Sequence, residues 1–181
     1  MGYAFAAERY GVEPDMITFA KGVTSGAVPM AGVVVRKSIY DAFMNGPEHM
    51  VEFTHGYTYS AHPLACAAGL ATLDIYRDEK LFERAKKLEP AFAEAVMSLK
   101  GQPNVLDIRT VGLTAGIDLA PRAADLVGKR GYDAMTNAFH DNDLMLRTAG
   151  DTLALTPPLI ISEDQIGEVV EKVGKVIRAV A

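Results

Sequence analysis

Short apolar runs set off by glycine and proline dominate the first third of the sequence. Met16–Ala20 follows Pro14-Asp15 and reads MITFA, which predicts a buried strand. The small and flexible residues of Lys21–Gly26 come next and predict a loop at the exit of that strand. Ala31–Val35 is rich in β-branched residues and apolar on both faces, which predicts a second strand that is covered on both sides.

Helical patterns follow these strands, separated by a polar stretch. Ser38–Phe43 predicts a short helix with Ser38 as its N-cap, and Gly46–Ser60 predicts a long loop. His62-Pro63 then opens a helix, with proline near the first helical position, where its missing N–H costs little. This helix is apolar almost all round, which indicates that it lies inside a larger body.

The second half of the chain alternates apolar residues with polar or small ones. Glu79–Leu99 has an apolar stripe at spacings of three and four and predicts a helix, which Pro90 is expected to kink or divide. The turn Gly101–Asn104 precedes segments that are typical of antiparallel strands with one wet face. Ser162 and Gln165 form a capping box that begins a C-terminal amphipathic helix. The other elements predicted here are the strands Val105–Arg109, Leu113–Leu119, Leu144–Arg147 and Thr152–Leu155 and the helix Gly131–Asn142.

Composition narrows the class of protein. The chain has 181 residues, of which 49% are apolar and 23% charged, as in ordinary globular domains. Its net charge of −5, without a cluster of Lys and Arg, argues against a nucleic-acid surface. No apolar run approaches the roughly 20 residues that cross a bilayer, so no membrane span is expected. Glu8 and Arg9 interrupt the first apolar stretch, so no signal peptide is predicted and we expect a cytoplasmic protein.

Cysteine and histidine limit the chemistry further. Cys66 is the single cysteine, which excludes an internal disulfide and a cysteine-based zinc site. The histidines lack the spacing of a metal-ligand set, so no metal is expected; they are His49, His55, His62 and His140.

Lys21 is the residue with the clearest chemical potential. It directly follows a predicted buried strand, and ligands of open α/β sheets bind at the carboxyl ends of strands. Apolar surroundings disfavour the charged form of a lysine, so its amine becomes a nucleophile that can form a Schiff base with an aldehyde. Position alone also fits a lysine that reaches into solvent, and on that ground the second interpretation is the commoner one.

Several segments of the chain carry a family resemblance in their order and spacing. They are Asp15–Gly22 (DMITFAKG), Ala27–Val33, His55–Ala68 (HGYTYSAHPLACAA), Leu146–Asp151 (LRTAGD) and Pro157–Ile161. Together they span nearly the whole chain, which resembles the class III (omega) aminotransferases, enzymes that use pyridoxal 5′-phosphate. Within that family the chain looks most like the omega-amino acid–pyruvate (β-alanine–pyruvate) aminotransferases.

The resemblance implies roles for particular residues. Lys21 matches the lysine that forms the Schiff base with pyridoxal phosphate and moves a proton to or from the substrate. Thr58 matches the threonine that contacts the cofactor phosphate from the neighbouring subunit, with Tyr57 and Tyr59 beside it, so a homodimer or a higher oligomer is implied. Arg147 matches the arginine that pairs with a substrate carboxylate and swings aside for uncharged substrates.

The implied fold is α/β and forms the C-terminal part of a fold-type I pyridoxal-phosphate transferase. Residues 1–78 would be the end of its large mixed-sheet domain, and residues 79–181 its small α+β domain with the linking helix. The family's phosphate loop, its stacking aromatic residue and the aspartate that pairs with the pyridine nitrogen have no counterpart in this sequence. Little or no transaminase activity is therefore expected of the 181 residues by themselves.

Three functions remain open at this point. The first is transfer of an amino group from an omega-amino acid, such as β-alanine, or an amine to pyruvate. The second is another class III activity, such as that of ornithine, 4-aminobutyrate or diaminopelargonate aminotransferases or of an aminomutase. The third is an inactive segment that serves only as an assembly module.

Overall fold

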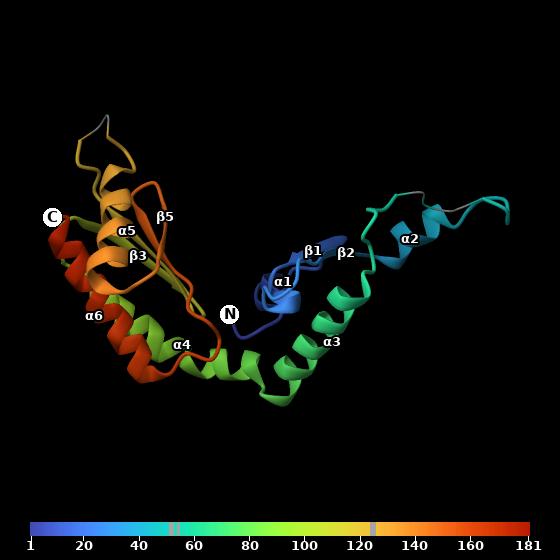
Figure 1. Cartoon of the computed structure of the whole chain (residues 1–181), viewed down its shortest axis with the longest axis horizontal. Coiled ribbons are helices and arrows are strands. Elements are labelled where there is room, and N and C mark those ends of the chain that lie inside the picture. The colour runs from blue at the N-terminus through green and yellow to red at the C-terminus, as the bar shows by residue number, and fades with distance from the viewer. Residues whose placement is uncertain (51–52, 54, 124–125) are drawn as a thin grey trace. The chain divides into compact units, whose positions relative to one another are not determined.

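The structure, a computed structural model, describes residues 1–50, 53, 55–123 and 126–181 (Figure 1). The chain forms two compact units. Tyr10–Lys80 is here called the strand-pair unit, and Met1–Arg9 together with Leu81–Ala181 is called the four-stranded unit. The assignment of residues 1–78 and 79–181 to a large and a small domain stays a prediction. None of the helices in the described ranges has the length and apolar character that a membrane crossing requires.

Two antiparallel strands form the centre of the strand-pair unit, as the apolar runs predict. β1 (Met16–Ala20) pairs with β2 (Ala31–Val35), with Met16 opposite Val35 and Ala20 opposite Ala31. The short 3-10 helix η1 (Gly22–Thr24) lies in the connection between them.

The exposure of these strands differs from the prediction. Met16, Val33 and Val34 are 59%, 58% and 57% exposed. The described residues form only a two-stranded sheet here, which leaves both strand edges unpaired. The expectation that both strands are buried is therefore wrong for this chain by itself.

The helix α2 (Lys37–Phe43) begins one residue earlier than its predicted cap. Arg36 is the N-cap and makes no side-chain capping hydrogen bond, so the prediction of Ser38 as N-cap is wrong. The described residues of the predicted loop Gly46–Ser60 form neither helix nor strand, and residues 51, 52 and 54 lie outside the described part.

The helix α3 (Pro63–Asp78) begins at its proline, as predicted. His62 precedes it, and the His62 Nδ1 accepts a hydrogen bond of 3.3 Å from the backbone N–H of Leu64. Only a narrow stripe of small residues is buried along α3, namely Ala65, Gly69 and Thr72. The leucines on its other faces are exposed, so the described residues do not provide the expected enclosure of this helix.

An antiparallel sheet in the order β3-β4-β6-β5 forms one layer of the four-stranded unit. Its strands are β3 (Val105–Val111), β4 (Thr114–Leu119), β5 (Arg147–Ala149) and β6 (Thr152–Leu155). The predicted alternating segments are confirmed as strands, except that Leu144–Leu146 precede β5, because its pairing with β6 begins at Arg147 opposite Ala154.

Three helices pack beside this sheet: α4 (Leu81–Met97), α5 (Lys129–Asn142) and α6 (Glu163–Ala179). In Figure 1, α6 lies along both α4 and α5. Pro90 lies inside α4 without dividing it, and the predicted capping box of α6 is confirmed by the hydrogen bonds between Ser162 and Gln165. The core contains the fully buried side chains Phe92, Val96, Ile117, Leu153, Val173, Val176 and Ile177.

Asp151 fixes the turn between β5 and β6 to the start of α5. Its carboxylate is buried and accepts hydrogen bonds from the backbone N–H groups of Gly128 (2.7 Å) and Gly131 (2.8 Å). These N–H groups have no partner within the helix, and the positive helix end favours a negative charge. A side chain at Gly131 would overlap the carbonyl oxygen of Gly150, so glycine is required for this close approach.

Glu89 on α4 holds the first residues of the chain in the four-stranded unit. The Arg9 guanidinium donates to both carboxylate oxygens of Glu89, at 2.7 and 2.9 Å, and the backbone N–H of Gly112 donates to Oε1 at 3.0 Å. The hydrogen bonds from Arg9 are the main reason why the pKa of Glu89 lies below its ordinary value, against partial burial, which raises it.

We predict that Glu89→Gln destabilises the four-stranded unit by about 1–2 kcal/mol near neutral pH. A carboxyl whose pKa is lowered by folding stabilises the fold above its unfolded pKa, and this contribution is lost as the pH falls through the folded pKa. The deficit should therefore shrink once the pH is well below about 4. Urea unfolding followed by circular dichroism at pH 7 and pH 3 would measure it, and an equal deficit at both pH values would contradict the prediction.

Candidate active site

Lys21 directly follows β1, and its backbone is strained. Its φ of 58° and ψ of −74° lie outside the helical and extended regions. A residue with a Cβ keeps such a conformation, at a cost of roughly 1–3 kcal/mol, only where its surroundings determine it. The Lys21 carbonyl accepts hydrogen bonds from the backbone N–H groups of Thr24 (3.2 Å) and Gly26 (2.9 Å). The turn after β1 thus holds the lysine backbone from one side.

The helix α3 holds the same loop from the other side. The Tyr76 hydroxyl donates a hydrogen bond of 2.7 Å to the carbonyl oxygen of Gly22. Gly69 allows close packing, since a Cβ there would lie 3.3 Å from the sulfur of Met30. The loop that carries Lys21 is therefore fixed by a side-chain hydrogen bond and by a glycine contact on one helix.

A pocket of about 500 Å³ lies beside Lys21. Small and apolar residues line it, namely Ala20, Gly26, Val28, Pro29, Met30 and Ala31. Thr24 is buried next to this loop, and its hydroxyl donates a hydrogen bond of 2.6 Å to the Val28 carbonyl. The structure thus places Lys21 beside an open, largely apolar pocket at the end of a strand.

The surroundings of the Lys21 side chain differ in part from the prediction. The residue is exposed, so the part of the chain that the structure describes does not supply the apolar enclosure that the sequence suggests. Within the described residues, Lys21 makes no ion pair with an acidic side chain. An amine without a carboxylate partner is available to react with a carbonyl compound.

Thr58 lies in a tight turn ahead of α3. The Tyr57 N–H donates to Ser60 Oγ at 3.1 Å, and the Ser60 N–H donates back to the Tyr57 carbonyl at 2.9 Å. Tyr57 and Tyr59 are 79% and 78% exposed, and Thr58 between them is exposed as well.

The structure does not bring Thr58 and Lys21 together through any hydrogen bond of the described residues. The lysine loop packs at Gly69 and Tyr76, whereas the Thr58 turn precedes Pro63. A helix rises about 1.5 Å per residue, so these two levels of α3 are about 9–20 Å apart along its axis.

Arg147 is the first residue of β5 in the four-stranded unit. It is exposed, and no acidic side chain of the described residues forms an ion pair with it. The β5–β6 hairpin that carries Arg147 is held at its other end by Asp151. A guanidinium in this setting can bind a carboxylate through two parallel hydrogen bonds.

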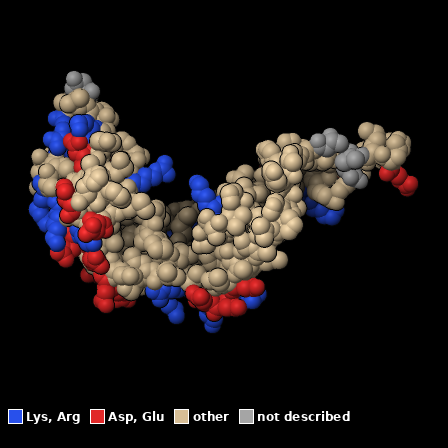
Figure 2. All heavy atoms as spheres, viewed as in Figure 1, with Lys and Arg blue, Asp and Glu red and all other residues tan. Residues whose placement is uncertain are grey.

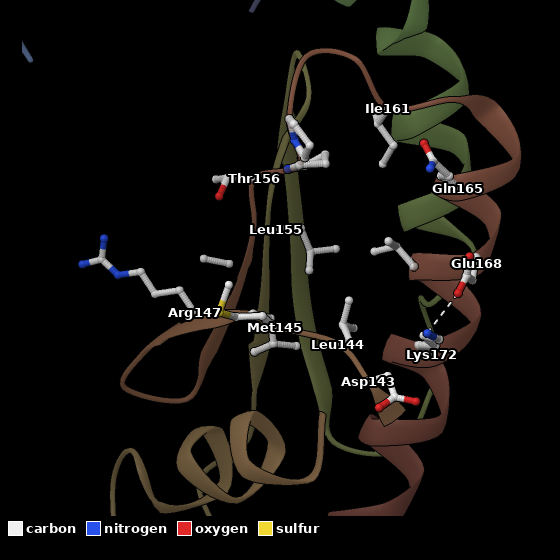
Figure 3. Close-up of a pocket in the computed structure, with 15 residues that line it drawn as sticks. Asp143, Leu144, Met145, Arg147, Leu155, Thr156, Ile161, Gln165, Glu168 and Lys172 are labelled. Atoms are coloured by element: carbon white, nitrogen blue, oxygen red, sulfur yellow. Dashed lines mark ion pairs between the residues drawn. The ribbon is translucent and has the colours of Figure 1, made fainter. Parts of the chain in front are cut away.

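A second pocket, of about 710 Å³, lies beside Arg147 and is formed by residues 143–147, residues 154–158 and one face of α6. Figure 3 shows Leu144 and Leu155 pointing into it, while the Arg147 side chain extends away from them. Lys172 at its edge pairs with Glu168 at 2.9 Å. Arg147 is thus a lining residue of this pocket whose guanidinium extends outward from it.

Charge is distributed differently over the two units. Figure 2 shows charged side chains close together over the helices of the four-stranded unit, where Lys172 and Lys175 pair with Glu168 and Glu171. The viewed face of the strand-pair unit is largely uncharged, in agreement with its many exposed apolar side chains.

Sequence reasoning missed the residues that hold the lysine loop. They are Gly69 and Tyr76, which lie seven residues apart and so share one face of α3 with the buried Thr72. The leucines of this helix dominate its apolar pattern in the sequence. The buried stripe, which consists of small and polar residues, is therefore hard to recognise from the sequence. A glycine and a tyrosine seven residues apart on one helix face were the signal that could have pointed to this contact.

Comparisons with known proteins agree on one family. The family described as aminotransferase class-III matches residues 1–177. An omega-aminotransferase of Caulobacter vibrioides is 48% identical over 177 residues, which are 98% of this chain and 40% of that protein. A beta-alanine–pyruvate aminotransferase of Pseudomonas aeruginosa is 42% identical over 183 aligned residues, covering 100% of this chain and 40% of that protein. The chain spans about 40% of the length of these curated relatives.

Solved structures show the same likeness. A thermostable (S)-enantioselective omega-transaminase from Thermomicrobium roseum matches with a TM-score of 0.88 at 33% identity, over 99% of this chain and 40% of that one. The likeness confirms the predicted class of fold, a mixed α/β architecture that is a portion of a fold-type I transferase.

We predict that Lys21→Gly stabilises the strand-pair unit by up to about 1 kcal/mol, since glycine adopts a positive φ without a Cβ clash. Lys37→Gly is the control, because Lys37 lies in the helix α2, where glycine costs about 0.5–1 kcal/mol relative to a good helix former. Thermal unfolding followed by circular dichroism compares the two variants. If both lose stability equally, the backbone of Lys21 is not strained in solution.

Proposed function

Because the chain belongs to the class III aminotransferases, we propose that it is part of an enzyme that moves an amino group from an omega-amino acid, such as β-alanine, to pyruvate. The observation that carries this proposal is the Lys21 amine, which lies at a pocket at the end of β1 without an ion-pair partner among the described residues. The relatives of 42–48% identity, named as an omega-aminotransferase and a beta-alanine–pyruvate aminotransferase, favour this substrate pair.

Class III aminotransferases use pyridoxal phosphate, and the residues present fit such a group. A primary amine suits its aldehyde, and a pocket with small walls leaves room for a flat ring. When bound, the group supplies the electron sink that the reaction needs. Lys21 would hold this group through its aldehyde carbon, and the Lys21 amine would be the base that moves the proton at the substrate Cα.

Thr58 and Tyr57 complete the site from a second copy of the chain in this proposal. Within one chain, the Thr58 turn lies at a different level of α3 from the Lys21 loop. The Thr58 hydroxyl is exposed in a turn of small and aromatic residues and suits a phosphate oxygen of the partner's cofactor. The enzyme is therefore a homodimer or a higher oligomer with shared sites.

Arg147 binds the carboxylate of the amino donor. Its guanidinium is exposed, lacks an acidic partner within the described residues and extends away from the neighbouring pocket (Figure 3). A donor carboxylate that accepts hydrogen bonds from two nitrogens of the Arg147 guanidinium is held in one orientation. The amine of the donor is then held at a fixed distance from Arg147. Arg147 thus selects donors that carry a carboxylate.

We predict that pyridoxal phosphate labels Lys21 in preference to other lysines. Lys80 is the matched control within the same unit, because it is also exposed and has a positive φ of 50°. The chain would be titrated with pyridoxal phosphate, reduced with borohydride and digested, and each lysine peptide quantified by mass spectrometry. Lys21 should be labelled at least about tenfold more than Lys80 at low cofactor concentration, as expected for a binding preference of about 1.4 kcal/mol. Equal labelling would overturn the proposal.

We predict that the 181-residue chain has little or no transaminase activity even when pyridoxal phosphate is supplied. The family aspartate that keeps the pyridine nitrogen protonated has no counterpart in this sequence, so the bound ring would be a poorer electron sink. Alanine formation from β-alanine and pyruvate measures the activity. A turnover equal to that of an intact relative assayed in parallel would refute this prediction.

A further inference from the structure

We infer that Tyr76 is a positioning residue for Lys21, acting through the peptide that follows the lysine. This inference rests on the proposed function, because it assigns Tyr76 a role in the reactivity of the Lys21 amine. Tyr76 lies near the C-terminal end of α3 and donates its hydroxyl hydrogen to the Gly22 carbonyl at 2.7 Å. The two residues are 54 positions apart in the sequence, so this bond joins the helix to the loop directly.

The two peptide groups after Lys21 are held by different parts of the molecule. The Lys21 carbonyl accepts from Thr24 and Gly26, which belong to the same turn. The next carbonyl, that of Gly22, accepts from Tyr76 as well as from the Ser25 N–H at 3.1 Å. The hydrogen bond from Tyr76 is therefore the one that fixes the orientation of the Gly22 peptide group relative to α3.

The strain at Lys21 gives this bond its importance. A φ of 58° with a ψ of −74° is unfavourable for lysine and relaxes when the loop is released. Packing at Gly69 keeps the loop close to α3 but does not fix a peptide orientation, whereas a hydrogen bond to a carbonyl does. Without the hydroxyl, the Lys21 amine would sample directions away from the pocket beside it.

The test is Tyr76→Phe in the 181-residue chain, since this change removes one oxygen and keeps the ring. Tyr40→Phe is the matched control, because Tyr40 is a tyrosine of the same unit on the helix α2. Loss of one hydrogen bond changes an equilibrium by about two- to tenfold. Labelling of Lys21 by pyridoxal phosphate and borohydride should fall by that factor in Tyr76→Phe, with Lys80 unchanged and with no change in Tyr40→Phe.

Backbone hydrogen exchange gives a second readout that needs no cofactor. The N–H groups of Thr24 and Gly26 donate to Lys21, so they should exchange about two- to tenfold faster in Tyr76→Phe, while the amides of α3 stay protected. Unchanged exchange at Thr24 and Gly26, or faster exchange along the whole of α3, would overturn the inference. If wild-type Lys21 is not labelled selectively but the exchange result holds, the proposed function fails, and only the hold of Tyr76 on the backbone of the Lys21 loop stands.

Discussion

A lysine whose backbone lies outside the helical and extended regions keeps that conformation only while its neighbours hold it. In this chain the neighbours are a tight turn, which binds the Lys21 carbonyl, and the helix α3, which binds the next carbonyl through Tyr76. The narrow buried stripe of α3 has its reason here, because Gly69 lies where a Cβ would be only 3.3 Å from the sulfur of Met30. The geometry of the amine therefore depends on a helix more than forty residues further along the chain.

Much of the fold follows from local patterns. The two apolar runs, the helix that begins at Pro63 and the capping box at Ser162 each carry their signal within a few residues, and all are found where the sequence predicts them. Burial was not predictable in the same way. MITFA and AGVVV are typical of enclosed strands, but enclosure requires layers that the described residues of this chain do not supply.

The candidate site was less accessible to sequence reasoning. The place of Lys21 at the end of a strand is a local property and was predicted, whereas the hydrogen bond from Tyr76 of α3 to the following carbonyl was not. The wrong cap at Ser38 has a similar origin, because the N-cap lies two residues earlier, at Arg36, whose side chain reaches the carbonyls of Glu13 and Pro14. Contacts between segments far apart in the sequence determine both the Lys21 loop and the N-cap of α2. Such contacts cannot be read directly from a single sequence.

The anchoring of the β5–β6 turn has a mechanical consequence for Arg147. The hairpin is held at Asp151, and Arg147 lies at the opposite end of the three-residue strand β5, where its pairing with β6 begins. Rotation about the side-chain bonds of this arginine thus leaves the sheet and the helix α5 undisturbed. The Arg147 guanidinium can therefore change direction while the strands and the turn that carry it keep their positions.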